Sequence, residues 1–321
     1  MKTVISTDRN AAVELLRKGE LVALPTETVY GLAANALESI AVAKIFEAKE
    51  RPRFDPLIVH LPNRERLETI VNVPAKHRQL IARLTNKFWP GALTIVLPKR
   101  KIVPDIVTAG LDSVAVRLSA HPVFAEIAGE LDEPLAAPSA NRFGRVSPTT
   151  AQHVLDELDG RIPLIIDGGP TEHGIESTIV AVQDGKIAIL RRGPITNEQL
   201  SDFAKVVSLT GTRKISAPGQ LPSHYAPATP LRLIDNAEAF PHQKNQRVGL
   251  LAWSDKYRNS QPFAAVRNLS DDGDLRQAAA NLFRYLRELD ALSLDLIVAE
   301  RIPSQGLGAA IMDRLERASH R

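Results

Sequence analysis

Hydrophobic and polar positions along the first two thirds of the chain alternate between short apolar runs and helical stripes. Strands are predicted where β-branched residues cluster between turn residues, and helices where apolar residues recur every three or four positions. The predicted strands span residues 21–24, 57–61, 92–97, 114–118, 134–137 and 164–166, and a hairpin joins 177–182 to 186–190. The predicted helices span residues 8–18, 39–49, 74–88, 122–129 and 149–158. Such mixing predicts α/β or α+β layers.

The pattern changes near residue 210. Residues 208–230 contain four prolines and two glycines without a helical or strand period, which is typical of an extended linker. Beyond it, strands are predicted at 231–234, 248–253 and 294–299, an amphipathic helix at 274–289 and a closing helix at 308–319. Because 321 residues exceed what one core usually supports, we expect a first domain over 1–207, a linker over 208–230 and a small open α/β domain over 231–321.

Composition narrows the class of protein. Forty basic against 37 acidic residues leave a net charge of +3, too small to favour non-specific nucleic-acid binding. The absence of cysteine excludes thiol nucleophiles, disulfides and cysteine-based metal sites. No apolar run is long enough for a membrane span or a signal peptide, so a cytoplasmic protein is expected.

Four polar segments interrupt the predicted core of the first domain. They are PTETVYGL from Pro25, KERPRFDPLIVH from Lys49, LAAPSANRFGRVSPTT from Leu135, and DGGPTEHGIESTIV from Asp167 with LRRGP from Leu190. Hydroxyls, small residues and arginines at strand ends suit the binding of anions such as phosphate, or of hydroxyl groups, and Thr149 would place a helix N-terminus nearby. The alternatives are helix caps, a solvated charge run at Arg53 and a glycine-rich hairpin.

One strand carries a charge on a face that is otherwise apolar or small. In SVAVR, Ser113, Ala115 and Arg117 share one face while the valines occupy the other. A buried arginine requires an anion, either a ligand or an internal carboxylate. His60 ends another apolar strand, where a histidine is more often a core residue than a ligand.

Taken in order, these motifs resemble the threonylcarbamoyl-AMP synthase family, with a YrdC-type first domain and its C-terminal companion. FWPGALT, VAVR, SHYAP and the tail SQGLGAAIMDRLERA add to the ordered set, which covers nearly the whole chain. The resemblance implies an α/β fold, with a twisted mixed sheet, flanking helices and a concave, positively charged face, and a smaller open, Rossmann-like α/β domain. It also implies a nucleotidyltransferase that uses ATP with Mg²⁺, L-threonine and bicarbonate. The product would pass to a tRNA threonylcarbamoyl transferase that makes N6-threonylcarbamoyladenosine, and a weak tRNA contact remains open.

The resemblance also implies roles for particular residues. The positions that match threonine-binding residues are Thr28, His60, Arg117, Ala137 (through its backbone) and Ser177. The positions that match ATP-binding residues are Arg51, Ser113, Ser139, Ser147, Arg191 and Tyr225. Arg51 and Arg191 are the candidates for stabilising phosphate charge, Arg117 for the threonine carboxylate, and Tyr225 for a lid in the linker. No protein nucleophile is implied.

Two positions depart from the family pattern, and two other functions compete. Asp55 stands where the family usually has asparagine, and Phe143 where it often has serine. A module that binds tRNA or double-stranded RNA without catalysis would show steep salt dependence, but the arginines lie among serines and glycines rather than among aromatic residues. Carbamoyl transfer of the hydrogenase-maturation type would need zinc-finger-like segments, which a cysteine-free chain lacks.

Overall fold

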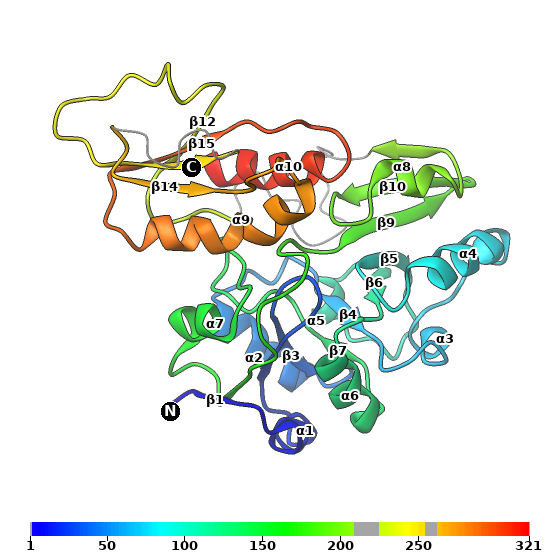
Figure 1. The fold of residues 1–321 in the computed structure, drawn as a ribbon. Coiled ribbons are helices and arrows are strands. Elements are labelled where there is room, and N and C mark those ends of the chain that lie inside the picture. Colours follow the sequence, from blue (N-terminus) through cyan, green and yellow to red (C-terminus); the bar gives the residue numbers. More distant parts are fainter. Residues whose placement is uncertain (1, 209–224, 254–261, 321) are drawn as a thin grey trace. The chain divides into compact units, whose positions relative to one another are not determined.

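The computed structural model describes residues 2–208, 225–253 and 262–320. They form two compact units (Figure 1). The first contains the described parts of 1–143, 148–171 and 176–220, and the second contains 144–147, 172–175 and the described parts of 221–321. Most of the predicted linker, residues 209–224, lies outside the described residues. In the described ranges, no helix is both long and apolar enough to cross a membrane.

The described strands of the first unit form one mixed sheet. They are β1 (Val4–Ser6), β2 (Val22–Leu24), β3 (Gly31–Asn35), β4 (Ile58–His60), β5 (Leu93–Pro98), β6 (Ser113–Arg117), β7 (Leu135–Ala136), β8 (Leu164–Ile166), β9 (Thr178–Gln183), β10 (Lys186–Arg191) and β11 (Val206–Ser208). Their order across the sheet is β1-β8-β2-β3-β7-β4-β6-β5-β9-β10-β11. The predicted hairpin is confirmed: β9 and β10 pair antiparallel, and Asp184 and Gly185 have positive φ.

The described helices of the first unit are α1 (Arg9–Arg17), α2 (Ser39–Lys49), α3 (Leu67–Ile70), the 3₁₀ turn η1 (Ala75–His77), α4 (Arg78–Phe88), α5 (Asp105–Thr108), α6 (Pro122–Leu131), α7 (Ala151–Leu158) and α8 (Asn197–Ser201). The five predicted helices of the first unit are present, whereas its short helices α3, α5 and α8 were not predicted. Two predicted starts were wrong. The helix predicted from Pro74 begins at Arg78 after η1, and Thr150 rather than Thr149 caps α7, accepting a hydrogen bond from His153 N at 3.2 Å.

The two faces of this sheet are covered differently. On one face, alternate strand residues such as Val59, Val116 and Val180 pack into a large core with α2, α4 and α7. On the other face, α1 and α6 cover the end formed by β8, β2, β3 and β7. Over β4, β6, β5, β9 and β10 that second face carries a small apolar cluster made of strand residues alone, including Ile58 and Ala115. By strand alternation His60 and Arg117, which lie two positions from Ile58 and Ala115, share this second face.

The second unit is a smaller α/β layer. Its described strands are β12 (Leu231–Ile234), β13 (Val248–Ala252), β14 (Ala265–Asn268) and β15 (Leu296–Glu300), and its described helices are α9 (Leu275–Asp290) and α10 (Gly308–Ser319). All strand pairs are parallel, in the order β12-β15-β13-β14. Helix α9 begins one residue later than predicted, with Asp274 as its N-cap, and Leu282, Leu286 and Leu289 of its predicted stripe are buried. The predicted fold class, a mixed α/β sheet plus a smaller open α/β domain, is confirmed.

Candidate functional site

Strand β6 confirms the predicted division of its side chains between two faces. Val114 and Val116 pack into the large core, whereas Ala115 joins the small cluster on the opposite face. Arg117 shares the face of Ala115, and only 2% of its surface is exposed. A guanidinium so deeply buried needs a charged partner close by.

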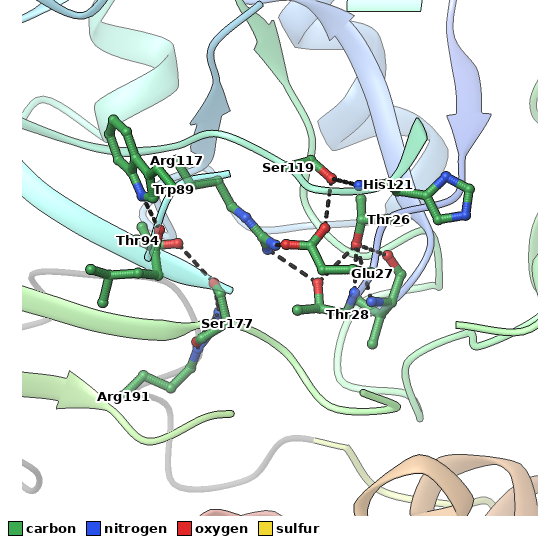
Figure 2. A network of polar contacts seen from close by, with 12 residues as sticks. Thr26, Glu27, Thr28, Trp89, Thr94, Arg117, Ser119, His121, Ser177 and Arg191 are labelled. Carbon is green, nitrogen blue, oxygen red and sulfur yellow. Dashed lines mark hydrogen bonds and ion pairs between the residues drawn. The ribbon is translucent and has the colours of Figure 1, made fainter. Parts of the chain in front are cut away.

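That partner is Glu27, from the PTETVYGL segment. Arg117 and Glu27 form a buried ion pair, and Arg117 Nη1 donates to Thr28 Oγ1 at 3.1 Å (Figure 2). Ser119 Oγ donates to the second oxygen of Glu27 at 2.6 Å. Burial raises the pKa of the Glu27 carboxyl, but the Arg117 charge and the Ser119 hydroxyl lower it by more, so the pKa lies below its usual range. The internal carboxylate foreseen for Arg117 is therefore present and ionised.

Each threonine hydroxyl has one proton, and this decides which residue donates in the hydrogen bond between Thr26 and Thr28 beside the Arg117–Glu27 pair. Thr26 Oγ1 donates its proton to Val29 O at 2.6 Å, so in the 2.8 Å contact with Thr28 Oγ1 the donor has to be Thr28. The Thr28 hydroxyl thus donates its hydrogen bond to Thr26 and accepts one from Arg117. What it still offers is a lone pair, so a ligand group that meets Thr28 must be a donor.

His60 supplies a second polar group. The residue ends β4, is 2% exposed, and its ring centroid lies 4.8 Å from that of Phe124. Burial and then the Arg117 charge hold the pKa of His60 well below its usual range, and a hydrogen bond with the backbone of Ala137 opposes them. Nδ1 is buried and has no hydrogen-bond partner among the described residues. At neutral pH the ring is therefore uncharged, and its buried Nδ1 is available to a ligand.

The depressed pKa of His60 makes folding stability depend on pH. Because the native ring binds a proton less readily than the unfolded one, stability is fully present above about pH 6.5 and is lost as pH falls toward the folded-state pKa. One such group contributes a slope of up to about 1.4 kcal/mol per pH unit. Urea unfolding at pH 7.5 and 5.5 should show less pH dependence in His60→Gln than in the wild type. The exposed His320 provides the control: His320→Gln should retain the wild-type slope, and an unchanged slope in His60→Gln would contradict the assignment.

A second polar cluster joins the hairpin to β5. Arg191 Nε and Nη2 donate to Ser177 O at 3.1 and 2.9 Å, and Nη2 also donates to Ser177 Oγ at 3.1 Å. Ser177 Oγ and Thr94 Oγ1 are 2.8 Å apart (Figure 2). The register shift between Ile189 and Arg191 marks a bulge at the end of β10. Ser177 and Arg191, which are 14 positions apart, are therefore brought together.

A third cluster surrounds Asp55. Lys49, which is 1% exposed, donates to the backbone carbonyls of Ser139, at 2.5 Å, and of Asn141. Arg51 forms an ion pair with Asp55 at 2.8 Å and donates to the carbonyls of Asp55 and Pro56. Burial raises the pKa of the Asp55 carboxyl, while the charges of Arg51, Lys49 and Arg191 act against this rise. Arg191 at the end of β10 thus acts on the Asp55 carboxyl by its charge.

The remaining predicted residues fall in both units. Ala137 is buried, and its amide donates to Ile58 O at 3.0 Å, whereas Ser113 lines a cavity of about 480 Å³. Ser147 and Tyr225 belong to the second unit. Tyr225 is 1% exposed and lies between Phe283, at 5.5 Å, and the Arg314 guanidinium, at 5.4 Å. The structure therefore brings the residues of the first unit into neighbouring clusters, and Tyr225 lies within the core of the second unit.

Three contributors were missed from the sequence: Glu27, Thr94 and Ser119. Glu27 carries the clearest signal, because it is a carboxylate flanked by threonines directly after a buried strand. Thr94 alternates with Leu93 and Ile95 of β5, so strand period alone assigns it to the face opposite the large core. No local signal marks Ser119.

Comparison with known proteins identifies the family. A model described as "Telomere recombination", of the Sua5, YciO and YrdC proteins, matches residues 14–193. A model described as "Threonylcarbamoyl-AMP synthase, C-terminal domain" matches residues 195–320. Threonylcarbamoyl-AMP synthase of Bacillus subtilis is 42% identical over 96% of this chain and 92% of its own length. The chain belongs to the threonylcarbamoyl-AMP synthase family. The synthase of Pyrococcus abyssi is 38% identical over 96% of this chain and 93% of its own.

The family likeness extends to a solved structure. The crystal structure of Pyrococcus abyssi Sua5 complexed with L-threonine superimposes with a TM-score of 0.87 at 36% identity, covering 99% of this chain and 97% of that chain. This relative of the threonylcarbamoyl-AMP synthase family therefore has the same fold, including the mixed sheet and the small parallel sheet.

Proposed function

We propose that this chain joins L-threonine, bicarbonate and ATP into threonylcarbamoyl-AMP, with release of pyrophosphate. Membership of the synthase family supports the reaction. The observation that supports the assignment to particular side chains is the Arg117–Glu27 ion pair, which is buried on the second face of the sheet. Thr28 Oγ1 and His60 Nδ1 can each take a further hydrogen bond from a ligand. Such a set suits an amino acid, which brings one carboxylate and several donors.

The amino acid is assigned to the Arg117 cluster. Arg117 Nε is buried and has no hydrogen-bond partner among the described residues, so it is available to the threonine carboxylate. The lone pair of Thr28 and Nδ1 of His60 would accept from the amine and the side-chain hydroxyl of threonine. Ser177 and the backbone of Ala137, which adjoin β9 and β4, complete the proposed set.

The nucleotide is assigned to the cations around Asp55. Arg51 and Arg191 would stabilise the charge that develops on the phosphates. Within the first unit, Ser113 and Ser139 are the proposed further contacts for ATP, and the ATP contacts expected of Ser147 and Tyr225 stay predictions. In residues 2–208, 225–253 and 262–320 no group of three acidic or histidine side chains could hold a metal ion. We therefore expect Mg²⁺ to arrive with the triphosphate and to keep several water ligands.

The proposed reaction needs positioning and charge stabilisation rather than a protein nucleophile. The neutral amine of threonine attacks bicarbonate-derived carbon, an N–C bond forms, and water is lost. A carbamate oxygen then attacks the α-phosphorus of ATP, and the bond to the bridging oxygen breaks as pyrophosphate leaves. Holding both substrates in place supplies much of the rate enhancement, and a closed pocket protects the carbamate from water. The adenylate would serve a transferase that modifies tRNA.

A labelled assay tests the proposal. The full chain is incubated with ATP, Mg²⁺, L-threonine and carbon-13 bicarbonate, and the nucleotide products are analysed by mass spectrometry. We expect labelled threonylcarbamoyl-AMP and an equal amount of pyrophosphate, both lost when threonine or bicarbonate is omitted. Salt-sensitive RNA binding without threonine-dependent pyrophosphate release would instead support the RNA-binding alternative.

A further inference from the structure

Asp55 and Phe143 both lie close to the side chain of Arg51. Asp55 Oδ2 lies 2.8 Å from Arg51 Nη2, and the Arg51 guanidinium carbon lies 5.9 Å from the centre of the Phe143 ring. The Asp55 and Arg51 side chains are only 1% and 5% exposed. A carboxylate thus lies against an arginine proposed to stabilise phosphate.

The surroundings of Asp55 are those of a bound anion. Lys49 at the end of α2, Arg51 in the following loop and Arg191 at the end of β10 all act on it with positive charge. Glu157 of α7 acts on Lys49 with negative charge. The cations therefore come from two parts of the first unit, the end of α2 with its following loop and the end of β10, and the Asp55 carboxylate pairs directly with Arg51.

We propose that Asp55 is an internal counter-ion that occupies a phosphate subsite, and that the phosphates of the nucleotide have to displace it from Arg51. The proposal rests on the proposed function, which supplies the triphosphate. A like charge within about 4–6 Å disfavours a second anion, so Asp55 lowers the affinity for phosphate. The side chain sets nucleotide affinity without forming or breaking a bond.

A change of pH reveals the competition. Burial already raises the pKa of Asp55, against the pull of Arg51, Lys49 and Arg191, and an arriving phosphate would raise it further. Triphosphate binding is then coupled to uptake of a proton, and affinity strengthens as pH falls. A group that only shapes the loop would produce no such coupling.

Asp55→Asn removes the charge and keeps the shape. The backbone carbonyls of Asp55 and Pro56 continue to hold Arg51, at 3.2 and 2.8 Å, so the loop has reason to stay in place. The matched control is Asp105→Asn, because Asp105 pairs with Lys99 but has a side chain that is 85% exposed. Unfolding curves of all three proteins establish that they are folded before binding is compared.

The experiment measures binding of inorganic triphosphate to the full chain by calorimetry, without metal, between pH 5.5 and 8.5. At pH 8 we expect Asp55→Asn to bind roughly ten-fold more tightly than the wild type, the equivalent of one pKa unit. The difference should shrink as pH falls, while Asp105→Asn follows the wild type. With Mg²⁺ and threonine present, the KM for ATP should fall more than kcat changes.

Three results would overturn the proposal. Equal affinity of Asp55→Asn and wild type across the pH range would show that Asp55 does not compete with phosphate. Weaker binding of Mg²⁺–ATP alone by the variant would make Asp55 a metal ligand instead. If the wild type binds triphosphate and Asp55→Asn binds it no more tightly, only the role of Asp55 is contradicted and the proposed function stands. If neither protein binds triphosphate, both proposals are contradicted.

Discussion

Arg117→Ala is expected to abolish threonine-dependent pyrophosphate release and to destabilise the protein. The substitution removes the donor proposed for the threonine carboxylate, and it leaves Glu27, which is 5% exposed, without its ion-pair partner. Breaking a buried pair on one side typically destabilises by about 3–5 kcal/mol. Pyrophosphate release and urea unfolding of the same preparation measure the two effects. Turnover like that of the wild type would remove Arg117 from the site.

A pair of further variants separates binding from folding. In Arg117→Met combined with Glu27→Gln both charges are absent, so much of the lost stability should return, while activity should not. Arg117→Lys keeps a charge for Glu27 but loses the planar fork, and kcat/KM for threonine should fall by roughly a hundred-fold, equivalent to about 2.7 kcal/mol. If stability and activity recovered together in the double variant, Arg117 would be structural only.

Gly193→Ala is expected to disrupt the hydrogen bonds among Arg191, Ser177 and Thr94, although Gly193 makes none of them itself. A Cβ at Gly193 would lie 2.4 Å from Thr178 N and 2.5 Å from Glu176 O, and both are backbone atoms that cannot rotate away. The backbone around Ser177 would have to shift, and with it the contacts of Ser177 to Arg191 and Thr94. Overpacking usually destabilises by about 1–3 kcal/mol, and we expect a rise in the KM for ATP together with a lower kcat.

Gly185 offers the control within the same hairpin. It has a φ of +70° at the turn, but a Cβ there would have nothing within 4 Å. Gly185→Ala should therefore cost about 1 kcal/mol from backbone strain and leave steady-state kinetics unchanged. If both variants lost activity equally, hairpin stability rather than the backbone around Ser177 would explain the effect.

Local signals accounted for the elements that were predicted closely. Asp8 and Asp274 cap α1 and α9, and Asp184 with Gly185 turns the β9–β10 hairpin, because caps and tight turns depend on a few neighbouring residues. Strand β3 was missed, since Gly31–Asn35 is a run of small residues with little strand propensity. Its place between β2 and β7 comes from long-range pairing.

The sequence by itself determined which residue types carry the chemistry, and through strand period it assigned Arg117 to the face opposite the valines. Only the tertiary structure decided the partners: Glu27 lies 90 positions from Arg117, and Arg191 acts on Asp55 from 136 positions away. The burial of Tyr225 against Phe283 in the second unit was likewise decided there. The physical reason is that alternation along a strand specifies a face, whereas the atoms that meet on that face depend on how distant strands and loops pack.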